Sequence, residues 1–170
     1  MREIEASKIT QEVARLCMEA NFELEDDVQK ALEKARGTEE SPAGKEVLRQ
    51  IIENSGIARS ERMPMCQDTG LAVIFAEVGQ EAHITGGDFE DAINDGVRKG
   101  YTDGYLRKSV LADPVRGGNT GDNTPAVIHT TIVPGDKLKL WVVPKGGGSC
   151  LLYTSPSPRD RTRSRMPSSA

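Results

Sequence analysis

Apolar residues in the first third of the chain recur three and four positions apart, which predicts three amphipathic helices. The first is expected over residues 8–20, with Ser7 as its N-cap, and the second over residues 24–36, with Gly37 as its stop. The third opens at Ser41-Pro42 and is expected to end near Gly56. The apolar positions that carry this spacing are Ile9, Val13, Leu16, Cys17 and Ala20; Leu24, Val28, Ala31, Leu32 and Ala35; and Val47, Leu48, Ile51 and Ile52.

From Met63 onward the pattern shifts toward strands. Leu71–Val78 is a short apolar run between glycines and predicts a buried strand. Gly86-Gly87-Asp88 is expected to cap a further helix through Val97, and a short helix or turn is expected over residues 105–110. Residues 126–133 and 137–143 flank Pro134-Gly135-Asp136 and predict a β-hairpin. The fold class is therefore expected to be α+β, an amino-terminal helical region followed by a mixed β-sheet with flanking helices.

Composition and charge narrow the class of protein. The 170 residues are 36% hydrophobic and only 4% aromatic, so the core must be built mainly from Leu, Ile, Val and Ala. The net charge of −4 gives no indication of a nucleic-acid partner or an anionic membrane surface. No apolar run approaches the ~20 residues of a membrane helix, and the charged start does not resemble a signal peptide. A cytoplasmic, reducing location is expected, in which the cysteines stay unpaired.

The end of the chain does not match its body. Residues 151–170 carry four arginines against one aspartate, a net of +3, which leaves −7 on residues 1–150. The run Cys-Leu-Leu-Tyr-Thr-Ser at 150–155 can be encoded by TGT CTC TTA TAC ACA TCT, DNA that resembles a transposon end used in sequencing adapters. We expect residues 150–170 to be a non-native, disordered tail translated from adapter-like sequence. The simpler alternative is a natural basic disordered tail.

Cys66 is the main candidate for chemistry. It follows Pro64 and precedes Gly70 and a strand, so a turn rather than a helix is expected to hold it. That placement suits a metal thiolate or a nucleophile, although a small buried apolar residue is an equally good interpretation. Cys17 lies on an apolar helix stripe and is interpreted as a core residue.

Other polar positions remain ambiguous on the sequence alone. Neither an iron–sulfur nor a zinc pattern can be recognised from spacing, and His83 and His129 are interpreted as structural or surface residues. The glycine run at 146–148 and the loop at 119–124 could each contact an anion, with ordinary turns as the alternative for the loop. Arg107 could hold a carboxylate bidentately, and a solvated surface arginine is the plainer interpretation.

Four ordered segments together resemble one enzyme family. They are Pro64–Gly70, Gly100–Val110, Asn119–Ala126 and Pro144–Ser149. In order and spacing they resemble the amino-terminal part of the class I iron–sulfur fumarate hydratase and L(+)-tartrate dehydratase family, of the alpha-subunit type. Residues 1–149 are therefore expected to be the amino-terminal part of a truncated hydro-lyase catalytic domain.

This resemblance implies a [4Fe–4S] cluster held by three cysteines, with one iron open to substrate and Cys66 as one ligand. It implies that Gln67, Asp68, Arg107 and Gly148 bind the substrate, a small dicarboxylate. The other two cluster cysteines and the catalytic base are expected beyond this chain, so no catalytic residue is assigned within it. The implied reaction is the reversible hydration of fumarate to malate, and this chain alone is expected to be inactive.

Three alternatives stay open at this point. An L(+)-tartrate dehydratase alpha subunit fits the same motifs, and a non-catalytic assembly or binding subunit would use the same loops for a partner. A redox sensor would use Cys66 as a free thiol. The family resemblance also implies a beta subunit or carboxy-terminal domain as partner, together with homo-oligomerisation.

Overall fold

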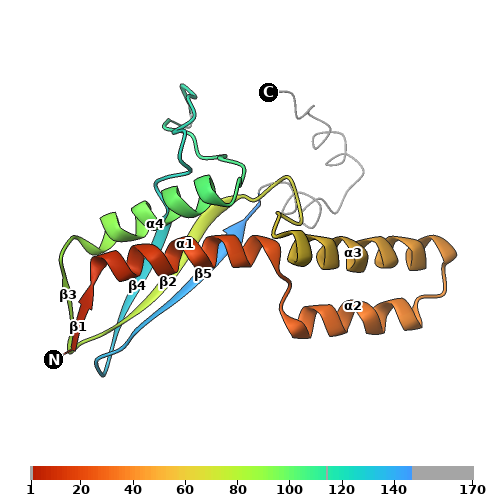
Figure 1. Ribbon diagram of the computed structural model, residues 1–170, viewed down its shortest axis with the longest axis horizontal. Helices are drawn as coiled ribbons and strands as arrows, with labels where there is room; N and C mark the ends of the chain where they lie inside the picture. Colours follow the sequence, from red (N-terminus) through yellow and green to blue (C-terminus); the bar gives the residue numbers. More distant parts are fainter. Residues whose placement is uncertain (1, 114, 147–170) are drawn as a thin grey trace.

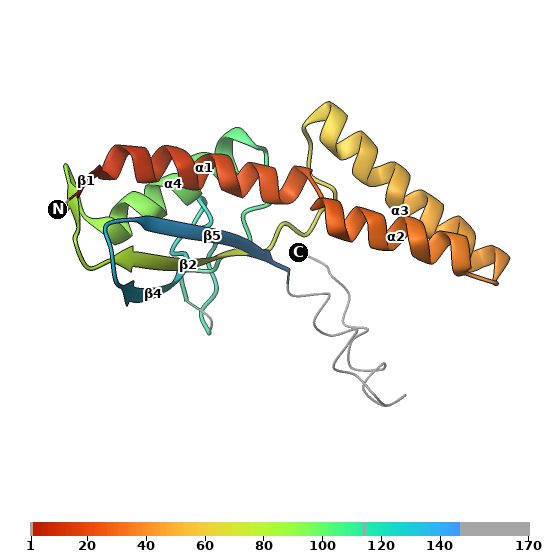
Figure 2. The same cartoon turned by 90° about the horizontal axis from the view of Figure 1, so that it is seen from below.

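The computed structural model describes residues 2–113 and 115–146 and has an α+β architecture, as expected. Helices α1 (Ala6–Phe22) and α4 (Phe89–Asp103) lie side by side over a three-stranded sheet of β2 (Leu71–Gly79), β4 (Val127–Val133) and β5 (Leu138–Lys145) (Figures 1 and 2). Helices α2 (Asp26–Thr38) and α3 (Pro42–Glu61) form a hairpin that extends away from this body. The short strands β1 (Arg2–Glu5) and β3 (Ala82–Thr85) pair in parallel.

The sheet is mixed, but the predicted hairpin of its last two strands is wrong. β2 lies between them, parallel to β4 and antiparallel to β5, with Val73 opposite both Val127 and Val143. The connection between β4 and β5 passes over the end of β2, where the Gly79 N–H donates to the Lys137 carbonyl at 2.8 Å. The alternating strand pattern and the Pro-Gly turn are compatible both with a hairpin and with a third strand between β4 and β5. Neither feature specifies which strand pairs with which.

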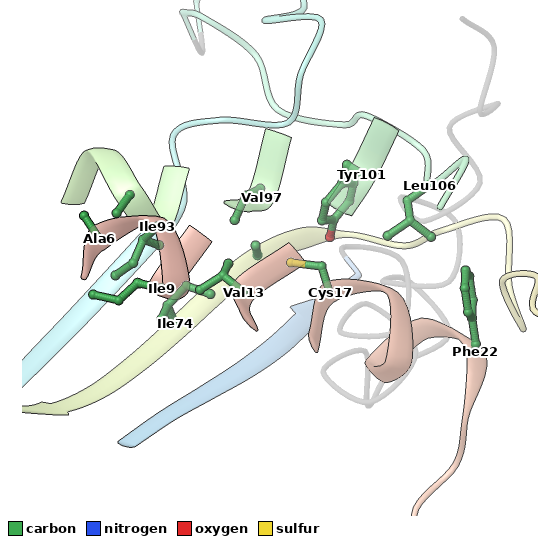
Figure 3. Close-up of a cluster of buried hydrophobic side chains, with 12 residues drawn as sticks. Ala6, Ile9, Val13, Cys17, Phe22, Ile74, Ile93, Val97, Tyr101 and Leu106 are labelled. Carbon is green, nitrogen blue, oxygen red and sulfur yellow. The ribbon is translucent and has the colours of Figure 1, made fainter. Parts of the chain in front are cut away.

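The core lies between the sheet and the two helices that cover it. Alternate side chains of β2 point toward the helices and are buried, whereas those on the opposite face are half-buried or, like Phe75, exposed. The prediction of a buried strand is thus confirmed for one face only. Figure 3 shows the cluster formed by the facing side chains. Its members are Ala6, Ile9, Val13, Cys17, Phe22, Ala72, Ile74, Ala92, Ile93, Val97, Tyr101 and Leu106.

Helices α1 and α4 approach each other closely. A Cβ atom at Gly100 would lie 2.7 Å from the Ala14 carbonyl oxygen, so a larger residue there would force the helices apart. The Thr10 hydroxyl donates across the same interface to the Ala92 carbonyl at 2.9 Å. This packing fixes the carboxyl end of α4 beside the start of β2, where the candidate site lies.

The helix ends differ from the sequence predictions at three positions. Gly37, predicted to stop the second helix, lies inside α2, which continues to Thr38 and has Glu39 as its C-cap. Ser7 lies inside α1, whose N-cap is Glu5, and the Ser7 hydroxyl donates to that glutamate at 3.4 Å. Helix α3 continues past Gly56 to Glu61 and ends at Arg62, which has a left-handed backbone. A helical glycine costs only about 1 kcal/mol relative to alanine, which the buried neighbours of Gly56 can offset. The N-cap prediction at Ser41 is confirmed.

Among the helices within residues 2–113 and 115–146, none is both long and apolar enough to cross a lipid bilayer.

Candidate functional site

The predicted site residues Cys66, Gln67 and Arg107 meet around one surface cavity of about 520 Å³. Cys66 and Gln67 lie in the connection from α3 to β2, and Arg107 follows the turn after α4. All three side chains are solvent-exposed. Residues that are far apart in the sequence thus present a thiol, a carboxamide and a guanidinium to the same space. Pro64, Thr69 and Tyr105 complete the lining.

The connection that carries Cys66 is anchored by its main chain. The Met65 N–H donates to the Asn21 carbonyl at 3.0 Å, and the Met65 carbonyl accepts from the Asn54 side-chain amide at 2.8 Å. Cys66 therefore lies on a turn held between the end of α1 and helix α3, as predicted. Its side chain is exposed and faces the cavity rather than the core.

Thr69 connects this turn to the Arg107 segment. The Thr69 hydroxyl donates to the Arg107 carbonyl at 3.1 Å, and the Thr69 carbonyl accepts from the Tyr101 hydroxyl at 2.9 Å. Both Thr69 and Tyr101 are almost completely buried, and burial is the main reason that the pKa of the Tyr101 phenol is raised above its ordinary value. The phenol therefore remains a neutral donor at physiological pH.

Asp68 faces a different neighbour, the start of the 146–148 glycine run. Its carboxylate accepts from the Gly70 N–H at 3.1 Å, and a Cβ atom at Gly146 would lie 2.9 Å from Asp68 Oδ2. Gly70 has φ +64°, and a side chain there would overlap the Lys145 carbonyl, so only glycine permits this approach of β2 to the end of β5. Gly148, the other predicted substrate contact, lies outside the described residues.

The 119–124 loop forms Asx turns, which confirms the plainer of its two interpretations. Asn119 Oδ1 accepts from the Gly121 N–H at 2.7 Å, and Asp122 Oδ1 accepts from the Thr124 N–H at 3.0 Å. The Asn119 amide also donates to the Lys108 carbonyl at 2.7 Å. The loop therefore supports the main chain that follows Arg107.

Sequence reasoning missed three buried polar residues at the site: Thr69, Tyr101 and Asn123. Tyr101 occupies a position of the apolar α4 stripe, so it resembles an ordinary core residue in the pattern. Asn123 lies in a loop rich in short polar residues, where turn formation is a sufficient explanation. Only the folded chain shows that their polar atoms meet the Cys66 and Arg107 segments.

Among the described residues, Cys66 is the exposed cysteine that could act as a metal ligand. Within residues 2–113 and 115–146, no group of three or more His, Cys, Asp or Glu side chains is placed to hold a metal ion. Cys17 is buried in the core, and burial raises the pKa of its thiol from 9.0 to about 12. His129 stacks on Phe75 with ring centroids 5.1 Å apart, outside the cavity. Of the two described cysteines, Cys66 is thus the exposed one, and a thiolate is the donor type that iron–sulfur clusters use.

Comparison with known proteins gives a consistent result. A family model described as fumarate hydratase (Fumerase) matches residues 10–154. The anaerobic class I fumarate hydratase of Escherichia coli is 42% identical over 113 residues, which cover 65% of this chain and 20% of that enzyme. The aerobic class I enzyme of the same organism is 42% identical over 116 residues, 67% of this chain and 21% of the enzyme.

A relative of a second kind aligns over a longer stretch. A protein of Methanocaldococcus jannaschii, named as the alpha subunit of an L(+)-tartrate dehydratase, is 34% identical over 149 residues. The alignment covers 84% of this chain and 52% of that protein. The chain thus spans about a fifth of the length of the two fumarate hydratases and about half of the alpha subunit.

Proposed function

Because this chain belongs to the class I fumarate hydratase and tartrate dehydratase alpha family, we propose that it forms the amino-terminal part of a hydro-lyase. The proposed reaction is the reversible hydration of fumarate to malate. One observation carries the proposal beyond family membership: Cys66, Gln67 and Arg107 line the same cavity. A thiolate for a metal and a guanidinium for a carboxylate are two of the features that metal-assisted dehydration of a dicarboxylate requires.

The protein side chains bind and orient the substrate in this proposal. The planar Arg107 guanidinium can donate two parallel hydrogen bonds to one carboxylate, which fixes the substrate in rotation as well as in distance. The Gln67 carboxamide lines the same cavity and can donate to a substrate oxygen. Asp68, held by the Gly70 N–H, and the backbone of Gly148 are the further proposed contacts. The catalytic base is proposed to lie outside this chain.

Cys66 would hold one iron of a [4Fe–4S] cluster. When bound, the cluster supplies an open iron that acts as a Lewis acid toward the substrate hydroxyl and carboxylate. The remaining cysteine ligands are proposed to come from parts of the hydro-lyase that this chain does not include. The exposure of Cys66 and the main-chain anchoring of Met65 support this role, because the ligand is accessible and its turn is fixed.

L(+)-tartrate dehydration is the second candidate. It is favoured by the alignment with the Methanocaldococcus jannaschii protein, which extends over 84% of this chain. The name of that relative refers to an alpha subunit, so this candidate also predicts a separate beta subunit as partner. Arg107 and Gln67 would hold the tartrate carboxylate in the same manner.

Purification of the protein encoded by the complete gene, under anaerobic conditions, tests both candidates. We expect bound iron and dehydration of either malate or tartrate, and the preferred substrate decides between them. Cys66→Ser should abolish activity and lower the iron content, whereas Cys17→Ala, the matched control, should retain both. A full-length protein without iron would refute the cluster assignment. Retention of iron and activity by Cys66→Ser would remove Cys66 from the ligand set.

A further inference from the structure

Asn123 is a completely buried polar residue that contacts the main chain next to the site but does not line the cavity. Its Oδ1 atom accepts from the Ser109 N–H at 2.6 Å and from the Val110 N–H at 3.2 Å. Its Nδ2 atom donates to the Gly70 carbonyl at 3.2 Å. One side chain therefore joins two main-chain segments that are far apart in the sequence and share no helix or strand pairing.

These two segments are the ones that carry the proposed site. Ser109 follows Arg107 by two residues, and Gly70 follows Cys66 by four. On the basis of the proposed function, we infer that Asn123 is a positioning residue. It determines the position of the Arg107 guanidinium relative to Cys66. Substrate that is bound at Arg107 would then lie at the correct distance from a metal held by Cys66, although Asn123 touches neither.

The chemistry of asparagine explains why this residue type suits the position. A carboxamide presents an acceptor oxygen and a donor nitrogen as separate atoms on one short side chain, and both are used here. The backbone of Asn123 has φ 65°, a left-handed conformation that asparagine adopts more readily than other residues with side chains. A leucine or valine would leave the Ser109 and Val110 N–H groups without this acceptor, and the Gly70 carbonyl would keep only the longer bond from the Tyr101 hydroxyl at 3.4 Å.

Thr69 supplies a second link between the same segments, through its hydroxyl and the Arg107 carbonyl at 3.1 Å. Loss of Asn123 should therefore loosen the Arg107 segment without releasing it completely. This is the behaviour expected of a residue that determines position, because a displacement of about 1 Å can lower the rate of an enzyme a hundredfold without preventing substrate binding.

The first test uses the 170-residue chain and measures amide hydrogen exchange by NMR. Asn123→Gly removes the side chain and keeps the left-handed backbone free of strain. We expect exchange at Ser109 and Val110 to accelerate about tenfold, the factor that corresponds to the loss of one net hydrogen bond. The control is Asn94→Ala, which removes another side-chain bond, from the Ala126 N–H at 2.9 Å, and leaves both bonds to Asn123 Oδ1 in place. Unchanged exchange at Ser109 and Val110 in Asn123→Gly would overturn the inference.

The second test uses the full-length enzyme. Asn123→Gly should raise the KM for the dicarboxylate or lower kcat by about tenfold to a hundredfold, with the iron content unchanged. Asn123→Asp keeps the acceptor for Ser109 and loses the donor to Gly70, so it should recover part of the exchange protection and part of the rate. Equal kinetic effects of Asn123→Gly and Asn94→Ala would overturn the positioning role. Absence of turnover in the wild-type enzyme would reject the proposed function, while the exchange result still decides whether Asn123 joins the two segments.

Discussion

Replacement of Tyr101 by phenylalanine tests how much the hydrogen bond between the Tyr101 hydroxyl and the Thr69 carbonyl stabilises the fold. Tyr101 is 1% exposed, and its hydroxyl donates to the Thr69 carbonyl at 2.9 Å. Phenylalanine keeps the ring and removes only the hydroxyl, so the apolar packing of α4 against α1 is preserved. The substitution leaves the Thr69 carbonyl without this donor on a residue that is 2% exposed. Loss of a buried partner of this kind costs about 1–3 kcal/mol in the free energy of unfolding.

Urea unfolding of the 170-residue chain, followed by circular dichroism, measures this difference directly. In thermal unfolding of the same chain, the midpoint temperature should fall by about 2–4 °C for each kcal/mol lost. Tyr105→Phe is the matched control. Tyr105 is 92% exposed, so removal of its hydroxyl should leave the free energy of unfolding unchanged. The reasoning is refuted if Tyr101→Phe unfolds at the wild-type urea concentration, or if the two substitutions destabilise the chain equally.

Four further outcomes follow from the same geometry. Gly70→Ala should destabilise the chain by more than about 1 kcal/mol in urea unfolding, because the backbone is left-handed and a Cβ atom meets the Lys145 carbonyl. Gly56→Ala, in the open interior of α3, should instead stabilise it by about 0.5–1 kcal/mol, and a loss there would contradict the helical assignment. Iodoacetamide should alkylate Cys66 in the native chain and spare Cys17, as peptide mass spectrometry can check; equal labelling would mean that the core is open. Because burial raises the pKa of Cys17 from 9.0 to about 12, its contribution to stability is complete below pH 9 and declines as the pH rises toward 12. Cys17→Ala should lessen this decline, and an unaltered alkaline profile of urea midpoints would show that the thiol is not the cause.

The sequence by itself determined the features that depend on near neighbours. Ser41 caps α3 and Asp88 caps α4 through N–H groups within the next three residues, and the apolar stripe of α1 follows from the period of the helix. Four short motifs in order, one of which contains Cys66, also pointed to the correct family. Each of these features depends on residues within a short stretch of chain, so it can be predicted from the local sequence.

Only the tertiary structure decided the pairing of strands and the assembly of the site. β4 and β5 adjoin in sequence, yet β2 lies between them, because backbone hydrogen bonding is the same for any strand that fits the position. Arg107 reaches the Cys66 cavity only because α4 packs on α1 and directs the chain back toward β2. Asn123 became recognisable only through its contacts, since its hydrogen bonds join segments with no common period in the sequence. Local periodicity specifies which face of a segment is buried, whereas the path of the whole chain specifies what that face meets.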